Sequence, residues 1–117
     1  MRGYITVPIA GEIVSGNPLR VSAETVSIPK KLIEKDELIY RVIDAFAHIE
    51  PGCFAIAELR DTAATGELVL ASVEGDVYVG RWWAKHGKQE LWIADGIQPE
   101  RGATILAVIN LVVSPHE

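Results

Sequence analysis

The sequence has few of the features that mark a secreted, metal-binding or membrane-spanning protein. Cys53 is the only cysteine, so no disulfide can form within the chain and no thiolate cluster can bind zinc. No run approaches the roughly 18 apolar residues that a membrane helix needs. The N-terminus also lacks a basic segment followed by an apolar core and a cleavage box. We therefore expect a cytoplasmic chain that does not bind to a membrane.

Basic residues are scarce as well. The chain carries 11 Lys and Arg against 16 Asp and Glu, which gives a net charge of −5. Binding to nucleic acid needs clustered cations that displace counterions from the phosphates, so we expect no direct nucleic-acid binding by this chain. The histidines His48, His86 and His116 do not have the spacing of metal ligands. We expect neither a metal nor a cofactor.

Apolar residues, in contrast, are plentiful and lie in short runs. They make up 49% of 117 residues, a composition and a length typical of one globular domain over residues 1–117. Turn signals separate the runs, which predicts a mainly β protein. The expected strands are Tyr4-Val14, Val21-Ile28, Glu37-Ile43, Cys53-Leu59, Glu67-Val73, Asp76-Trp83, Gln89-Ala94 and Thr104-Val113.

Two tight turns predict antiparallel hairpins. Glu74-Gly75 separates LVLASV from DVYVGRWW, and His86-Gly87 separates RWWAK from KQELW. A two-residue turn at His86-Gly87 places Trp83 opposite Glu90 and Arg81 opposite Trp92, all on one face. Trp82 then points to the other face.

Three segments resemble the C-terminal domain of LexA-type self-cleaving repressors, a family that includes UmuD and phage repressors. They are VPIAGEIVSGNPL at the cleavage loop, ELIYRV with HIEPGCFAIAEL around the nucleophile, and GELVLASVEGDVYVGRWWAKHGKQELW across the next strands. Their order covers nearly the whole chain. The resemblance implies a compact fold of twisted antiparallel strands with at most one or two short helical turns, and a role in transcription regulation of the SOS or phage type.

The resemblance also bears on one ambiguous segment. Leu32, Ile39, Ile43 and Phe46 fall on one face at helical spacing, which favours a helix over Lys30-Ala47. The alternative is a strand over residues 37–43 followed by a helical turn over residues 44–48. We choose the strand because the family has one there.

The family cuts itself with a Ser nucleophile and a Lys base, and both positions are vacant in this sequence. The segment after Arg41-Val42 contains no hydroxyl or thiol through His48, and the position that matches the Lys is Gly80. The cleavage-loop-like residues are Val14, Ser15 and Gly16, where the family usually has Ala-Gly or Cys-Gly. The vestigial cleft is assigned to Asp44, Ala45, Phe46, Ala47, Tyr78 and Gly80. We therefore expect a pseudo-protease.

Other residues offer weak replacements for the missing pair. We assign Cys53 to the core because it starts an apolar strand. Lys85 and Lys88 flank a hairpin turn, where lysines are usually solvated. Asp44 is interpreted as a cap of the short turn rather than an acid.

Two functions from different classes remain open. The first is a catalytically inactive regulatory and dimerisation domain of a LexA-like regulator that lacks its DNA-binding half. We expect its homodimer to form through the last strand, at Ile105, Ala107, Val108, Ile109 and Leu111. The alternative is a stand-alone β module that binds a peptide or small ligand in the vestigial cleft. A hydrolase with an unfamiliar dyad is a weaker third interpretation.

The exposed aromatic hairpin could also contact a protein partner. Trp83 and Trp92 share their face with Arg81, and these residue types are enriched at interface hot spots. The competing interpretation is that this face only stabilises the hairpin.

Overall fold

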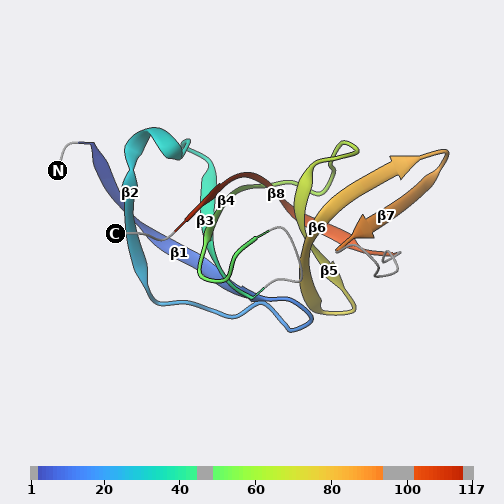
Figure 1. Cartoon of the computed structure of the whole chain (residues 1–117), viewed down its shortest axis with the longest axis horizontal. Helices are drawn as coiled ribbons and strands as arrows, with labels where there is room; N and C mark the ends of the chain where they lie inside the picture. The colour runs from blue at the N-terminus through green and yellow to red at the C-terminus, as the bar shows by residue number, and fades with distance from the viewer. Residues whose placement is uncertain (1–2, 45–48, 94–101, 115–117) are drawn as a thin grey trace.

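The described residues form one eight-stranded sheet (Figure 1). The structure is a computed structural model that describes residues 3–44, 49–93 and 102–114. Strand order in the sheet is β2-β1-β3-β4-β8-β5-β6-β7. The strands are β1 (Tyr4–Val14), β2 (Thr25–Pro29), β3 (Glu37–Asp44), β4 (Phe54–Leu59), β5 (Leu68–Val73), β6 (Asp76–Lys85), β7 (Lys88–Trp92) and β8 (Thr104–Val113).

The prediction of a mainly β protein is confirmed. In the described ranges, the helical element is a 3-10 turn, η1, at Lys30–Leu32. No helix in these ranges is long and apolar enough to cross a membrane. The sheet is mixed rather than wholly antiparallel, because β1 pairs with β3 in parallel. The long connection through β2 and η1 allows this parallel pairing, since parallel neighbours need a crossover.

Strand bounds agree with the sequence prediction to within two residues except at the start of β2. β1 and β8 have the predicted ends, whereas β2 begins at Thr25 instead of Val21. The Val21 side chain is 95% exposed. Just before β2, the Glu24 N–H donates to the Ser22 Oγ at 3.1 Å. Such a local side-chain bond competes with a regular ladder, which explains the later start of the strand.

The ambiguous segment contains a strand, as the resemblance implied. β3 runs from Glu37 to Asp44 and buries both of its faces, with Ile39 in one apolar cluster and Tyr40 and Val42 in another. Burial on both faces produces a continuous apolar run, which a helical period also matches by chance. The helical turn predicted over residues 44–48 falls mostly outside the described residues.

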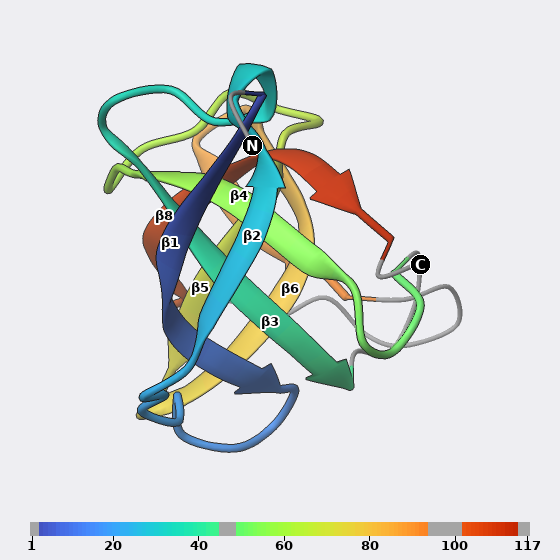
Figure 2. The ribbon, with the colours of Figure 1, turned by 90° about the vertical axis from the view of Figure 1, so that its left-hand side faces the viewer.

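The sheet is curled and elongated. Its extents are 48 × 23 × 22 Å, with β2 at one end of the long axis and the β6–β7 hairpin at the other (Figure 1). Viewed from the β2 end, the strands wrap around a common interior (Figure 2). This curling allows one sheet to enclose its own core.

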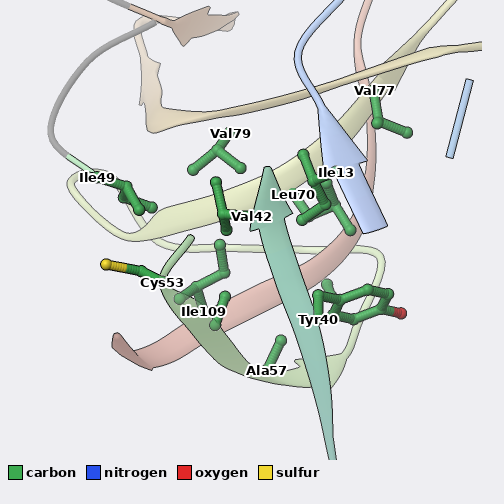
Figure 3. Close-up of a cluster of buried hydrophobic side chains, with 12 residues drawn as sticks. Ile13, Tyr40, Val42, Ile49, Cys53, Ala57, Leu70, Val77, Val79 and Ile109 are labelled. Carbon is green, nitrogen blue, oxygen red and sulfur yellow. The ribbon is translucent and has the colours of Figure 1, made fainter. Parts of the chain in front are cut away.

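The main apolar cluster lies inside the curl (Figure 3). Its side chains come from β1, β3, β4, β5, β6 and β8 and from the segment before β4. Cys53 is 3% exposed within it, so its assignment to the core is confirmed. The labelled members are Ile13, Tyr40, Val42, Ile49, Cys53, Ala57, Leu70, Val77, Val79 and Ile109.

Candidate functional site

The segment that resembles the cleavage loop leaves the end of β1 and lies against β6. The Gly16 N–H donates to the Val77 carbonyl oxygen at 2.9 Å, and the Val77 N–H donates to the Asn17 carbonyl oxygen at 2.9 Å. These bonds form a short antiparallel bridge between residues far apart in sequence. The Ser15-Gly16 peptide is therefore fixed by backbone hydrogen bonds on its C-terminal side. No local signal in the sequence predicted this bridge.

Part of the vestigial cleft gathers around this segment. The Ser15 N–H donates to the Asp44 carbonyl oxygen at 3.1 Å. A Cβ placed on Gly16 would lie 3.8 Å from the Tyr78 hydroxyl oxygen. The structure thus brings together Ser15, Gly16, Asp44 and Tyr78. Three further predicted residues, Ala45, Phe46 and Ala47, lie outside the described residues, as does the turn that Asp44 was expected to cap.

Ser15 and Gly16 both have unusual local environments. Gly16 has a φ of 84°, a left-handed conformation in which a Cβ is strained. The Ser15 Oγ is buried and has no hydrogen-bond partner. A buried hydroxyl without a partner loses its hydration with no compensation. The departure from the family's Ala-Gly therefore places a costly polar atom at this peptide.

The position that matches the catalytic lysine has no room for a side chain. A Cβ on Gly80 would lie 2.5 Å from the backbone oxygen of Trp92 and 3.1 Å from the Leu91 Cδ1. Real Cβ atoms essentially never approach a backbone atom so closely. The empty space expected beside Gly80 is therefore filled by β7. A lysine could enter only if the backbone shifted.

The other residues considered as a nucleophile or base lie away from the cleavage-loop-like segment or are solvated. Cys53 is buried in the core. Lys85 and Lys88 are exposed beside the hairpin turn. The Lys85 Nζ lies over the Trp83 ring, 5.0 Å from its centroid. A general base must reach the nucleophile's proton, and nothing in these contacts directs either lysine toward Ser15.

The environment of Tyr40 shifts the pKa of its phenol. Burial raises the pKa of the Tyr40 phenol above its ordinary value of 10.0, because the buried site disfavours the charged phenolate. Across residues 3–44, 49–93 and 102–114, no three His, Cys, Asp or Glu side chains come together as metal ligands would.

The β6–β7 hairpin has the predicted register and shows which of its faces is exposed. Trp83 lies opposite Glu90, and Arg81 lies opposite Trp92. Trp83 and Trp92 are 40% and 43% exposed, whereas Trp82 is 4% exposed. Trp82 therefore belongs to the core face.

The contacts of the hairpin cations differ from the prediction. Arg81 shares the face of both indoles and could have stacked on one of them, but within the described ranges the cation over an indole is Lys85. The Arg81 Nη1 donates instead to the Gly66 carbonyl oxygen at 3.1 Å. Gly66 also lines a hollow between the exposed indoles. Sequence reasoning missed Gly66, because its only local signal is a turn before β5.

The last strand lies within the sheet, between β4 and β5. Four of its five predicted dimer residues are buried within the single chain, so their apolar character requires no partner. These are Ile105, Ala107, Val108 and Ile109. The fifth, Leu111, is 38% exposed. The described β8 residues pair with β5 over 104–108 and with β4 over 107–113.

Comparison with known proteins gives one informative match. No family model matches the chain. The chain is similar to a LexA repressor from Carboxydothermus hydrogenoformans, with 30% identity over 86 residues, which are 68% of this chain and 42% of the repressor. The chain thus spans less than half of the repressor's length. The similarity supports a relationship between this protein and LexA repressors.

Proposed function

We propose that this chain is a catalytically inactive regulatory and dimerisation domain of a LexA-like transcriptional regulator of the SOS or phage type, and that it does not itself contact DNA. The main support for inactivity is the close contact at Gly80, where a Cβ would lie 2.5 Å from the Trp92 backbone oxygen. The site that a Lys base would need is therefore occupied. We take residues 1–117 as one domain in the cytoplasm.

The sequence beside β3 supports the same conclusion. Residues 43–48 read IDAFAH and contain no Ser, Thr or Cys that could attack a carbonyl. Self-cleavage by a Ser/Lys pair needs the nucleophile and its base together. Restoring one of them would leave the other missing, so the loss is not repaired by a single substitution.

The dimer is proposed at the exposed end of β8. Residues 109–113 pair with β4 on one side, while the described part of β5 pairs only with residues up to Val108. A groove of about 740 Å³ lies beside this end and is lined by Leu111, Val112 and Val113 together with β2 residues. A strand edge beside an apolar groove can pair with the same edge of a second copy about a two-fold axis. This supports a homodimer centred on residues 110–113.

A ligand-binding module is the alternative. It was expected to use the vestigial cleft, but the space that a Cβ on Gly80 would take is filled by Leu91 and Trp92. That contact favours the regulatory domain over the ligand-binding module. It equally disfavours a hydrolase with an unfamiliar dyad built at this position.

Intact-mass measurement tests the inactivity. The purified chain is incubated at about pH 10, where a lysine base would be largely deprotonated. We expect the full-length mass alone after prolonged incubation. Fragments that end at Ser15 and begin at Gly16 would overturn the proposal, provided that added protease inhibitors do not suppress them.

A further inference from the structure

The β6–β7 hairpin extends to one end of the molecule (Figure 1), and its outer face exposes two large aromatic side chains. Trp83 and Trp92 are 40% and 43% exposed, whereas Trp82 and Leu91 on the opposite face are 4% and 0% exposed. The buried face already anchors the hairpin in the core. The outer indoles are therefore available for another molecule.

Both exposed indoles line a hollow in this face. It measures about 330 Å³ and is lined by Gly66, Arg81, Trp82, Trp83 and Trp92. A Cβ on Gly66 would meet nothing within 4 Å, so the absence of a side chain there leaves the hollow open. The Gly66 N–H donates to the Trp82 carbonyl oxygen at 2.7 Å, and the Arg81 Nη1 donates to the Gly66 carbonyl oxygen at 3.1 Å. Hydrogen bonds thus fix the wall that Gly66 forms.

The charge around the hollow differs in sign from that of the whole chain. Arg81 and Lys85 flank Trp83 on this face of β6, and on β7 Lys88 lies opposite Lys85 and Glu90 lies opposite Trp83. The chain as a whole carries −5. Lys85 is held over the Trp83 ring at 5.0 Å. The hollow has Arg81 in its lining, and Lys85 lies over the adjoining Trp83 ring with Lys88 opposite it on the neighbouring strand. Such a surface complements an apolar side chain flanked by carboxylates.

We infer that the Trp83–Trp92 face docks an acidic segment of a partner protein, which inserts one bulky apolar side chain between the indoles and places its carboxylates against Arg81, Lys85 and Lys88. Single-stranded nucleic acid also stacks on aromatics. Three cations beside Glu90, on a chain with a net charge of −5, make a weak phosphate-binding surface. The acidic peptide is therefore the better complement. This inference does not depend on whether the chain cuts itself.

Fluorescence anisotropy tests the inference with defined probes. The probes are fluorescein-labelled peptides of the pattern Glu-Asp-X-Asp-Glu, in which X is Leu, Ile, Phe or Trp. The comparison probes are the same pattern with X as Gly, a Lys-Arg-X-Arg-Lys series, a labelled oligothymidine and anionic phosphatidylserine vesicles. We expect saturable binding of the acidic series with a bulky X, and binding weakened at least about tenfold by X as Gly.

Variants test whether binding depends on the Trp83–Trp92 face or only on the net charge of the chain. Trp83→Ala and Trp92→Ala should each weaken binding at least about tenfold, whereas Val21→Ala, at a 95% exposed site elsewhere, should not. The double substitution Lys85→Glu with Lys88→Glu should abolish binding. Lys30→Glu with Lys31→Glu makes the same change in net charge away from the hairpin and should leave binding within about twofold.

Three outcomes would overturn the inference. They are no saturable binding of any acidic peptide by the folded wild-type chain, equal loss of binding in both double variants, and tighter binding of oligothymidine or vesicles than of the acidic peptides. Circular dichroism of each variant establishes that it remains folded. The charge variants keep the inference testable if a Trp variant unfolds, because all four lysines are exposed.

Discussion

Gly80 of β6 approaches the backbone of Trp92 so closely that a Cβ on Gly80 would lie 2.5 Å from the Trp92 oxygen. The contact joins β6 to the end of β7 on the core face, where Leu91 and Trp82 pack together. Position 80 therefore serves the packing of the hairpin. In the proposed function, backbone contact thus fills the position compared with that of the Lys base.

Replacing Gly80 with lysine should therefore destabilise the fold without restoring cleavage. Overpacking of this kind typically costs about 1–3 kcal/mol, and the neighbour here is backbone, which cannot rotate away. Urea denaturation of Gly80→Lys measures the loss. Gly3→Lys is the matched control, because a Cβ on Gly3 meets nothing within 4 Å. A Gly80→Lys variant that is as stable as the wild type, or that cuts itself, would contradict the account.

Removing the Ser15 hydroxyl should stabilise the protein. The Ser15 Oγ is buried without a partner, and an unpaired buried polar group costs about 1–3 kcal/mol. We expect Ser15→Ala to raise the free energy of unfolding by about 1 kcal/mol. Ser27→Ala, at an exposed site on β2, should change it little. A clear loss of stability in Ser15→Ala would show that the hydroxyl has a partner after all.

Stability should fall at alkaline pH in a way that depends on Tyr40. Burial raises the pKa of Tyr40 in the folded state above 10.0, so the folded chain holds the phenol proton more tightly than the unfolded chain. The protonated Tyr40 phenol stabilises the folded chain fully below about pH 10, and this stabilisation is lost as the pH rises through the folded-state pKa. Tyr40→Phe should reduce this decline in chemical denaturation between about pH 9 and pH 11.5. Tyr4→Phe retains Tyr40 and should retain the decline.

Charges placed at two positions of β8 should have different effects. Val108 is 1% exposed in the core, so Val108→Glu should unfold the chain, because a buried unpaired carboxylate costs several kcal/mol. Leu111 is 38% exposed beside the groove, so Leu111→Glu should give a folded monomer. Circular dichroism with light scattering distinguishes these results. A folded Leu111→Glu dimer would remove residues 110–113 from the proposed interface.

Much of the fold follows from local patterns in the sequence. The hairpins at Glu74-Gly75 and His86-Gly87 are confirmed, and both residues of each turn have positive φ. Two-residue turns of this kind have a strong local signature, and they fix the register of the strands that follow. The exposed Trp83–Trp92 face follows from that register.

The features that the sequence did not reveal depend on contacts between distant residues. In β8, Asn110 is an extra residue between the pairs that Ile109 and Leu111 make with β4. Its Nδ2 donates to the Glu37 Oε2 at 2.7 Å. A bulge of this kind interrupts the alternation of faces beyond residue 109. Residues 107–109 are buried consecutively because β8 has an apolar cluster on each face, with Ala107 and Ile109 in one and Val108 in the other. The close approach of the Trp92 backbone to Gly80 likewise depends on where β7 ends.

Light scattering of the unmodified chain tests the proposed regulatory and dimerisation domain most directly. Each chain has a mass of 12.8 kDa. Size-exclusion chromatography with multi-angle light scattering, over a range of micromolar concentrations, should give the mass of two chains at the upper end. A mass of one chain at every concentration would contradict the homodimer and with it the proposed dimerisation domain.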